Sequence, residues 1–256
     1  MMDYPLTRAN RLRLARVFAP IPRVDISIEC VLEDQMGRAF VDSVDDPCAY
    51  LLELDGFFCY FGGDVRSAAG RALVEALPSG RMIMSGPPGW EQIIEATFGE
   101  QLIKIERYSY RSDTLSLDHL RKLAAANPNT AHVQRVDVAL AQSAPAYLEI
   151  GGYESVEDFV ARGIGYCLML NSESAGCAYA SLVNSSAIEV SIVVAPDQRQ
   201  KGVATALAAQ LLIWCLENHL APHWDAANEE SCGLAEKLGY TKVGTYNAYF
   251  LKARAS

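Results

Sequence analysis

Apolar residues in the second half of the chain follow a pattern that predicts strands first and helices later. Residues 165–170 (GYCLML), 176–183 (GCAYASLV) and 187–194 (AIEVSIVV) are short, rich in β-branched and aromatic side chains, and separated by turn residues. They predict three strands, and connections this short favour antiparallel neighbours. The spacing that follows predicts a helix over 203–218, a strand over 222–226, a helix over 229–238 and a strand over 240–251.

The first half has the same order of expected elements. Strands are predicted at residues 37–42, 48–54, 56–61, 81–85 and 101–111, and helices at 65–77 and 90–98. Both halves therefore have the order β-β-β-α-β-α-β, although few residues are identical between them. We interpret this as a duplicated unit rather than one large sheet, because 256 residues fit two domains of about 130.

The expected domains follow from this repeat. An N-terminal domain covers residues 1–112, a linker covers 113–130 with a helix near 118–125, and a C-terminal domain covers 131–256. The expected class is α/β (α+β), with mixed, mostly antiparallel sheets flanked by helices.

Composition and charge exclude several function classes. The net charge of −9 is spread over both halves without a basic patch, which argues against a nucleic-acid partner. No run of about 20 apolar residues occurs, so no membrane span is expected, and the N-terminus does not resemble a signal peptide. The seven cysteines form no CxxC pair and four scattered histidines form no metal site, so we expect buried thiols, a cytoplasmic location and no metal.

One segment carries candidate chemistry, the stretch APDQRQKGVA at residues 195–204. A strand that opens directly into a helix presents unpaired backbone N–H groups at the positive end of the helix dipole. Gly202 and Ala204 let an anion approach the backbone closely, while Arg199 and Lys201 add positive charge. The segment suits a pyrophosphate; a plain helix N-terminus with a glycine-containing loop is the alternative.

Two signatures in this order resemble the GNAT superfamily of acyl-CoA-dependent N-acetyltransferases. Residues 199–204 (RQKGVA) match its [RQ]-x-x-G-x-[GA] motif, and residues 228–240 (NEESCGLAEKLGY) are similar to its second signature, N-x-x-[AS]-x-x-L-[YA]-x-K-x-G-[FY]. Residues 222–239 also resemble a bacterial subfamily with the pattern P-x-W-D-A-x-N-x-x-S-x-x-L-A-x-K-L-G. The similarity is specific over 189–240 and weaker at 37–42 and 60–64.

The resemblance implies a fold in which the third and fourth strands of the C-terminal unit splay apart and acetyl-CoA fills the gap. Val193 and Val194 would pair their backbone with the pantetheine arm, and Trp224 and Asp225 would face the acceptor substrate. The implied cofactor-binding set is Val193, Val194, Arg199, Gln200, Lys201, Gly202, Val203, Ala204, Thr205, Asn228 and Ser231. The first half has only Gly62-Gly63-Asp64 at the corresponding place, where an N-capping Asp64 would repel phosphate.

Catalysis requires an amine that has lost a proton and a stabilised oxyanion. Glu189, on the third strand, is the candidate base; the alternative is a solvent-facing carboxylate on an alternating strand. The superfamily's usual acid is a Tyr at the position of Ala235, so that assignment fails here, and Tyr246 is the substitute.

The expected function is therefore an N-acetyltransferase that moves the acetyl group of acetyl-CoA to an amine by direct attack. The alternative is a non-catalytic acyl-CoA-binding or interaction module. The acceptor is a small-molecule amine, an amino acid or a peptide, and the chain is a monomer or a homodimer.

Overall fold

The computed structural model describes residues 1–84, 86, 89–143 and 145–253, and it forms two compact units. Unit 1 comprises residues 1–107 and 245–256, and unit 2 comprises residues 108–244. The strands at 102–111 and 241–251 each continue from one unit into the other, and each is described below with the unit in which its end pairs. The boundaries differ from the predicted domains, because the last residues of the chain belong to unit 1. The predicted linker also differs, since α5 (Leu117–Ala126) buries Leu120 and Ala124 in the core of unit 2.

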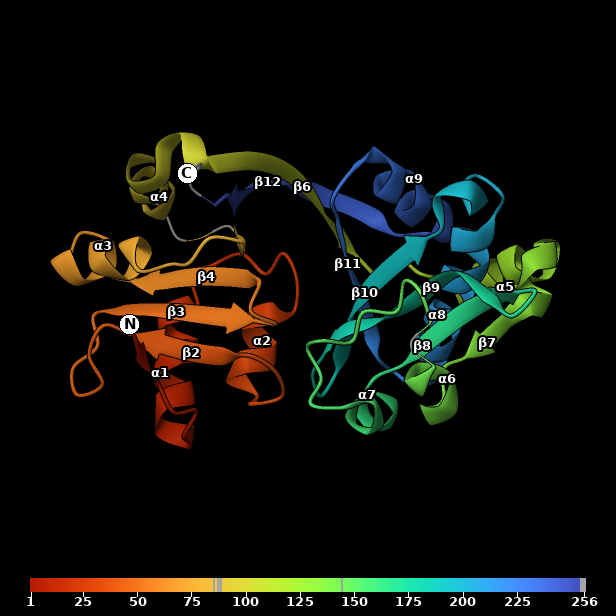
Figure 1. Cartoon of the computed structure of the whole chain (residues 1–256), viewed down its shortest axis with the longest axis horizontal. Helices are drawn as coiled ribbons and strands as arrows, with labels where there is room; N and C mark the ends of the chain where they lie inside the picture. Colours follow the sequence, from red (N-terminus) through yellow and green to blue (C-terminus); the bar gives the residue numbers. More distant parts are fainter. Residues whose placement is uncertain (85, 87–88, 144, 254–256) are drawn as a thin grey trace. The chain divides into compact units, whose positions relative to one another are not determined.

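Unit 1 has the strand order β1-β2-β3-β4-β5-β12; Figure 1 labels β2, β3, β4 and β12 of this set. All neighbours are antiparallel except β4 and β5, which are parallel. The strands are β1 (Met2–Asp3), β2 (Arg38–Val41), β3 (Ala49–Leu54), β4 (Phe58–Gly63), β5 (Arg81–Ile83) and β12 (Thr241–Leu251). The helices are α1 (Arg8–Phe18), α2 (Ser27–Leu32), α3 (Ala68–Glu75) and α4 (Trp90–Phe98).

Unit 2 has the strand order β6-β11-β10-β9-β8-β7, with β10 and β11 as its parallel pair. The strands are β6 (Leu102–Arg111), β7 (Val133–Arg135), β8 (Gly165–Leu170), β9 (Glu173–Val183), β10 (Ala187–Val194) and β11 (Ala221–Ala226). The helices besides α5 are α6 (Val138–Gln142), α7 (Val156–Arg162), α8 (Val203–Glu217) and α9 (Glu229–Leu238), joined by the 3-10 turns η2 (Pro128–His132) and η3 (Pro196–Gln198). The remaining 3-10 turn, η1 (Gly99–Gln101), leads into β6.

The predicted order β-β-β-α-β-α-β is confirmed in both halves, as β2-β3-β4-α3-β5-α4-β6 and β8-β9-β10-α8-β11-α9-β12. Three differences stand out. Helices α1 and α2 were not predicted. Helix α1 is arginine-rich and buries only Leu14 and Phe18, so its apolar spacing is a weak signal. Helix α3 begins at Ala68 with Ser67 as its N-cap, so Asp64 is not the cap. The predicted strand 81–85 ends at Ile83, and Ser85 lies outside the described residues.

The final strand of each half pairs within the unit built mainly from the other half. The end of β6 pairs with β11 through Tyr110 opposite Trp224, and the end of β12 pairs with β5 through Tyr249 opposite Ile83. Each unit therefore needs a strand from the distant part of the sequence to complete its sheet.

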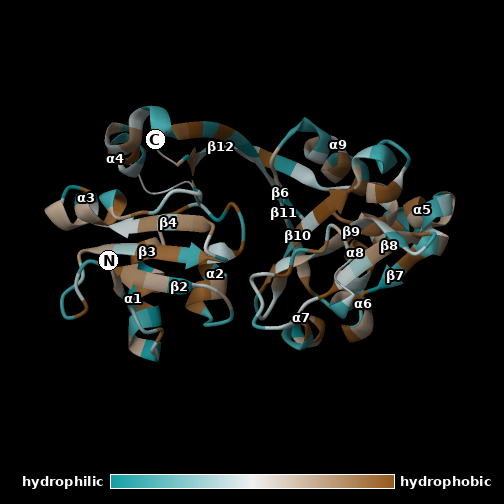
Figure 2. Ribbon diagram, in the orientation of Figure 1, coloured by the Kyte–Doolittle hydropathy of each residue, from teal (hydrophilic) through white to brown (hydrophobic). Residues whose placement is uncertain are grey.

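Strand β10 and helix α8 are rich in hydrophobic residues. Figure 2 shows hydrophobic colour along β10. Helix α8 is hydrophobic around most of its circumference and is buried along nearly its whole length, as expected for a helix enclosed by other elements. It packs against α5, β9 and β8. The position of this buried helix sets where the loop before it ends.

Candidate functional site: a pocket between two splayed strands

Strands β10 and β11 are paired only at one end. Ala187, Ile188 and Glu189 pair with residues 221–223, after which no further pairing joins the two strands. A register shift between Glu189 and Val190 marks the point at which they diverge. On its other edge, β10 stays paired with β9 as far as Val194. The predicted splay is thus present, and one edge of β10 beyond Glu189 faces an opening.

A pocket of about 490 Å³ occupies this opening. That volume is typical of ligand sites in proteins. Its walls come from β10, the loop before α8, the first turn of α8, the end of β11 and one face of α9. The lining residues are Val190, Ile192, Val193, Val194, Gln198, Arg199, Gln200, Gly202, Val203, Ala204, Thr205, Trp224, Asp225, Asn228, Glu230, Ser231, Leu234 and Lys237.

The N-terminus of α8 lies in the wall of this pocket. The chain reaches it through η3 and two residues with positive φ, Gln200 at 59° and Gly202 at 86°. Gly202 is the N-cap and has no side chain to bond the helix N–H groups, and the first turn of α8 contains no acidic residue. The first N–H groups of a helix have no intrahelical acceptor. They are therefore available to an anion, as the sequence predicted.

Twelve of the predicted site residues line this pocket, and the structure brings them together from three segments of the chain. They are Val193, Val194, Arg199, Gln200, Gly202, Val203, Ala204, Thr205, Trp224, Asp225, Asn228 and Ser231. Three other predicted residues do not line it, namely Lys201, Glu189 and Tyr246. Lys201 is exposed, and its Nζ donates to Gln198 Oε1 over 3.4 Å.

Glu189 lies at the narrow end of the splay. It is 9% exposed and is the last residue of β10 that pairs with β11, where it stands opposite His223. Tyr240 is close to it: burial, together with the nearby Cys215 thiol and the Glu189 carboxylate, raises the pKa of the Tyr240 hydroxyl well above its usual value. The predicted base is therefore not on the solvent-facing side of its strand, but next to the first pocket residue, Val190.

Tyr246 belongs to unit 1, whereas the pocket belongs to unit 2. The other tyrosine on the same strand, Tyr249, is part of the core of unit 1 and donates from Oη to Glu95 Oε1 over 2.7 Å. Burial raises the pKa of the Tyr249 hydroxyl. Tyr246 is not among the residues that line the pocket.

Helix α9 shapes the opposite wall. Asn228 caps this helix by accepting from Ser231 N over 2.9 Å, and Ser231 Oγ accepts from Trp224 Nε1 over 3.1 Å. Trp224 is 5% exposed and its ring lies 5.2 Å from that of Tyr240. Asn228 and Ser231 therefore position the wall as well as line the pocket, and Trp224 is both a core and a pocket residue.

Lys237 is a pocket residue that the sequence reasoning did not single out. Its Nζ donates to Thr205 Oγ1 over 3.1 Å, which places its charge beside the first turn of α8. The signal was available, because Lys237 is the lysine of the N-x-x-[AS]-x-x-L-[YA]-x-K-x-G-[FY] pattern. It adds a positive group at the end of the pocket where an anion would bind.

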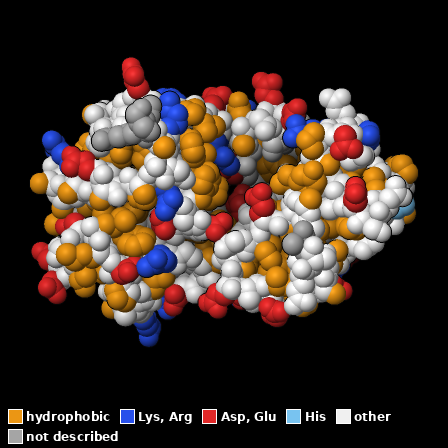
Figure 3. Space-filling model, in the orientation of Figure 1, with side chains coloured by type: hydrophobic (Ala, Val, Ile, Leu, Met, Phe, Trp, Pro, Cys, Tyr) orange, Lys and Arg blue, Asp and Glu red, His pale blue; other side chains and the backbone are white. Residues whose placement is uncertain are grey.

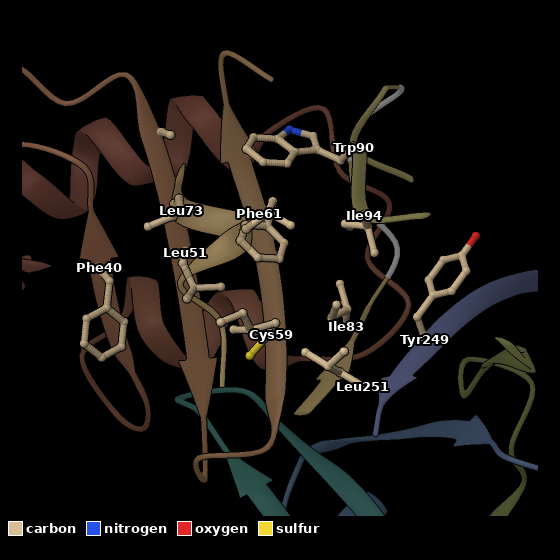
Figure 4. Close-up of a cluster of buried hydrophobic side chains, with 13 residues drawn as sticks. Phe40, Leu51, Cys59, Phe61, Leu73, Ile83, Trp90, Ile94, Tyr249 and Leu251 are labelled. Carbon is tan, nitrogen blue, oxygen red and sulfur yellow. The ribbon is translucent and has the colours of Figure 1, made fainter. Parts of the chain in front are cut away.

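The parallel pair of unit 1 lies beside packed aromatic side chains. Strands β4 and β5 pair only at Phe58 and Cys59. Beyond them, the rings of Phe61 and Trp90 stack with centroids 5.2 Å apart, and both side chains are 1% exposed (Figure 4). Asp64 accepts from Arg66 N over 2.9 Å at the turn that follows. A buried indole thus packs against Phe61 of β4 in unit 1.

Replacing Trp90 with Ala is expected to lower the free energy of unfolding by about 3–5 kcal/mol, because a large cavity would remain in the core. Among the described residues, Trp90 Nε1 donates a hydrogen bond to no acceptor. The Trp90→Phe control keeps the stacked ring and loses no hydrogen bond, so it should cost less than half as much. Urea denaturation measures both; equal losses would contradict the packing role of the ring.

Within the described residues, no helix is long and apolar enough to cross a membrane, and no group of three His, Cys, Asp or Glu side chains suits a metal ion. Among the described residues, none of the seven cysteines forms a disulfide; Cys48 is exposed and Cys232 is half-buried, so the prediction that all are buried is wrong for these two. Acidic and basic side chains are interspersed on the face shown in Figure 3.

Comparison with known proteins gives a consistent result. A family model described as GNAT acetyltransferase matches residues 22–249. The curated protein YdfB of Bacillus subtilis, named an uncharacterized N-acetyltransferase, is 21% identical over 227 residues, which cover 84% of this chain and 85% of YdfB.

Solved structures are also similar. A GCN5-related N-acetyltransferase-like protein from Streptococcus suis has a TM-score of 0.84 and 28% identity, covering 96% of this chain and 100% of that one. A GCN5-related N-acetyltransferase from Sphaerobacter thermophilus has a TM-score of 0.56 and 13% identity, covering 97% and 94%. The second likeness is one of fold alone.

Proposed function

Because the chain belongs to the GNAT acetyltransferase family, whose members transfer an acyl group from acetyl-CoA, we propose that unit 2 binds acetyl-CoA between β10 and β11 and acetylates an amine. The observation that carries the proposal is the opening between these strands, with the uncapped N-terminus of α8 in its wall. The residues present fit the co-substrate: a strand edge for an amide-containing arm and a helix N-terminus for phosphates.

The pantetheine arm would lie along the free edge of β10. Val193 and Val194 pair with Cys177 and Gly176 on the β9 side, while the other edge of β10 faces the pocket. Alternate residues of a strand direct their N–H and C=O groups to opposite edges. The amides of pantetheine could therefore add to β10 in the manner of a short strand.

The pyrophosphate would bind at the N-terminus of α8. The N–H groups of Gly202, Val203 and the residues that follow are available there, and the guanidinium of Arg199 and the ammonium of Lys237 add positive charge. Hydrogen bonds to a charged group are worth more than neutral ones, about 1.5–3 kcal/mol each. This local charge suits one diphosphate on an otherwise acidic protein.

We assign the chemistry to direct attack. The amine nitrogen bonds to the thioester carbonyl carbon, the C–S bond breaks, and the sulfur leaves as the CoA thiolate. The nitrogen then loses its second proton to the thiolate or to water, which leaves the amide and the CoA thiol. An alkylammonium with a pKa near ~10 must first be deprotonated, and we propose that the Glu189 carboxylate accepts this proton, directly or through water. N–H groups of β10 near Ile192 would stabilise the oxyanion. A thiol pKa of ~8.5 makes the thiolate a fair leaving group without a strong acid.

Glu189→Gln is expected to lower kcat about 100-fold, the lower end of what a general base contributes, with the KM for acetyl-CoA unchanged. The amide keeps the size of the side chain but cannot accept the proton. Steady-state release of CoA thiol at saturating amine and acetyl-CoA measures the effect. A kcat within twofold of wild type would exclude Glu189 as the base.

Isothermal titration with acetyl-CoA tests the proposed function as a whole. Turnover is then measured as CoA thiol release with a panel of small amines, amino acids and peptides. Binding without turnover on the whole panel would favour a non-catalytic acyl-CoA-binding module, an alternative raised by Ala235 at the position of the family's usual tyrosine. No binding would overturn the proposal.

We further propose that unit 1 does not bind acetyl-CoA and serves as a scaffold. The stacked Phe61 and Trp90 and the carboxylate of Asp64 support this. The acceptor is expected to be a small-molecule amine, an amino acid or a peptide, positioned near Trp224 and Asp225. Cysteines without disulfides fit a cytoplasmic location, and we propose that the chain is a monomer or a homodimer.

A further inference from the structure

Two asparagines from a distant turn hold the backbone of the phosphate loop. Asn129 Nδ2 donates to the Lys201 carbonyl over 2.8 Å, and Asn127 Nδ2 donates to the Gly202 carbonyl over 2.8 Å. Both asparagines belong to the turn formed by Asn127 and η2, which follows α5 and was predicted to be linker. These contacts join segments more than 70 residues apart in the sequence.

The turn itself is internally fixed. Asn127 Oδ1 accepts from Asn129 N over 3.0 Å, so each end of the Asn127 carboxamide is bonded. Thr130 Oγ1 donates to the Ala124 carbonyl over 2.8 Å and ties the turn to the end of α5. Since α5 packs against α8, the turn and the loop share one rigid support.

The consequence follows from peptide geometry. In a planar trans peptide the carbonyl and the N–H of the next residue point in opposite directions. Asn129 holds the Lys201 carbonyl, so the Gly202 N–H points away from the turn. The Gly202 carbonyl accepts from Asn127 Nδ2 and, as the first acceptor of α8, from Ala206 N over 3.0 Å, so the Val203 N–H points away as well. Gly202 and Val203 both line the pocket.

The loop also needs this support, because its conformation is strained. Gln200 has φ 59° and Gly202 has φ 86°. A non-glycine residue in the left-handed region persists only where its surroundings hold it. Cβ at position 202 would lie 3.2 Å from Asn127 Nδ2 and 3.4 Å from Asn129 Nδ2, so the glycine also makes room for the two carboxamides.

We propose that Asn127 and Asn129 are positioning residues that preset the Gly202 and Val203 N–H groups for the diphosphate of CoA. They do not touch the ligand. They act by fixing the loop before binding, which lowers the ordering cost of association. The inference rests on the proposed function, because it concerns the same pocket.

The test compares two probes by calorimetry: CoA, and pantetheine, the part of CoA that lacks the nucleotide and its phosphates. Asn129→Ala and Asn127→Ala are the variants; both remove the carboxamide donor to the loop without adding a charge, and the second also removes the Oδ1 acceptor of the turn. Each is expected to weaken CoA binding about tenfold and to leave pantetheine binding unchanged. Thr130→Ala is the matched control, because it removes a bond of the same turn without touching the loop.

Three outcomes would overturn the proposal. CoA affinities within twofold of wild type in both asparagine variants would show that the loop needs no such support. An equal loss of pantetheine affinity would show general damage to unit 2 rather than a misplaced loop. A wild-type chain that binds no CoA would remove the proposed function and the inference with it.

Discussion

Gly202→Glu is expected to weaken acetyl-CoA binding about 1000-fold, roughly 4 kcal/mol. Gly202 has φ 86°, which L side chains rarely adopt. A side chain there would also press on Asn127 and Asn129, and the loop would have to move. At least two charge-assisted hydrogen bonds of about 1.5–3 kcal/mol each would be lost, and the new carboxylate would repel the diphosphate. Isothermal titration with acetyl-CoA measures the change.

The chain offers a matched control in Gly233→Glu. Gly233 lies on α9, its Cβ would meet no atom within 4 Å, and it does not line the pocket. The same charge is added to the same unit, and the affinity should stay within twofold of wild type. If Gly202→Glu bound acetyl-CoA as tightly as this control, the N-terminus of α8 would not be the phosphate site.

A fragment of residues 131–256, the predicted C-terminal domain, is expected to show no cooperative unfolding transition. It lacks the end of β6, which pairs with β11, and it lacks α5. Tyr110 is 5% exposed, Leu120 0% and Ala124 6%, and all three belong to the core of unit 2. Each large apolar side chain contributes about 1.5–3 kcal/mol on burial, and whole domains are stable by only about 5–15 kcal/mol.

A fragment of residues 108–244, which matches unit 2, is the comparison. It keeps α5 and the β6 residues that pair with Trp224, Asp225 and Ala226. We expect a cooperative transition in urea, followed by circular dichroism, and acetyl-CoA binding within about tenfold of the full chain. Equal cooperativity of the two fragments would contradict the structural role of β6 and α5.

The elements next to the site were predictable because their causes are local. Residues 187–194 were predicted as a strand and form β10 with those bounds, since a β-branched run fits a half-buried pleated surface. Residues 229–238 were predicted as a helix and form α9, between an asparagine N-cap and Gly239 in the left-handed conformation. The loop glycine and the helix that follows were visible for the same reason.

The less periodic elements were not predictable in this way. Helix α1 exposes most of its arginine-rich surface, so its apolar spacing gives little signal. The boundary of α3 was placed at Asp64 instead of Ser67 because both residue types cap helices well. Here the nearby backbone, rather than the residue type, decides which side chain caps.

The sequence by itself determined the order of strands and helices in both halves, the loop before α8 and most of the residues that line the pocket. Only the tertiary structure decided the pairing of β6 with β11 and of β12 with β5, the stacking of Trp90 on Phe61, and the bonds from Asn127 and Asn129 to the loop. The physical reason is range. Helix and strand patterns arise from neighbouring residues, whereas an edge strand can pair with any compatible edge, and a carboxamide bonds whichever carbonyl the folded chain brings to it.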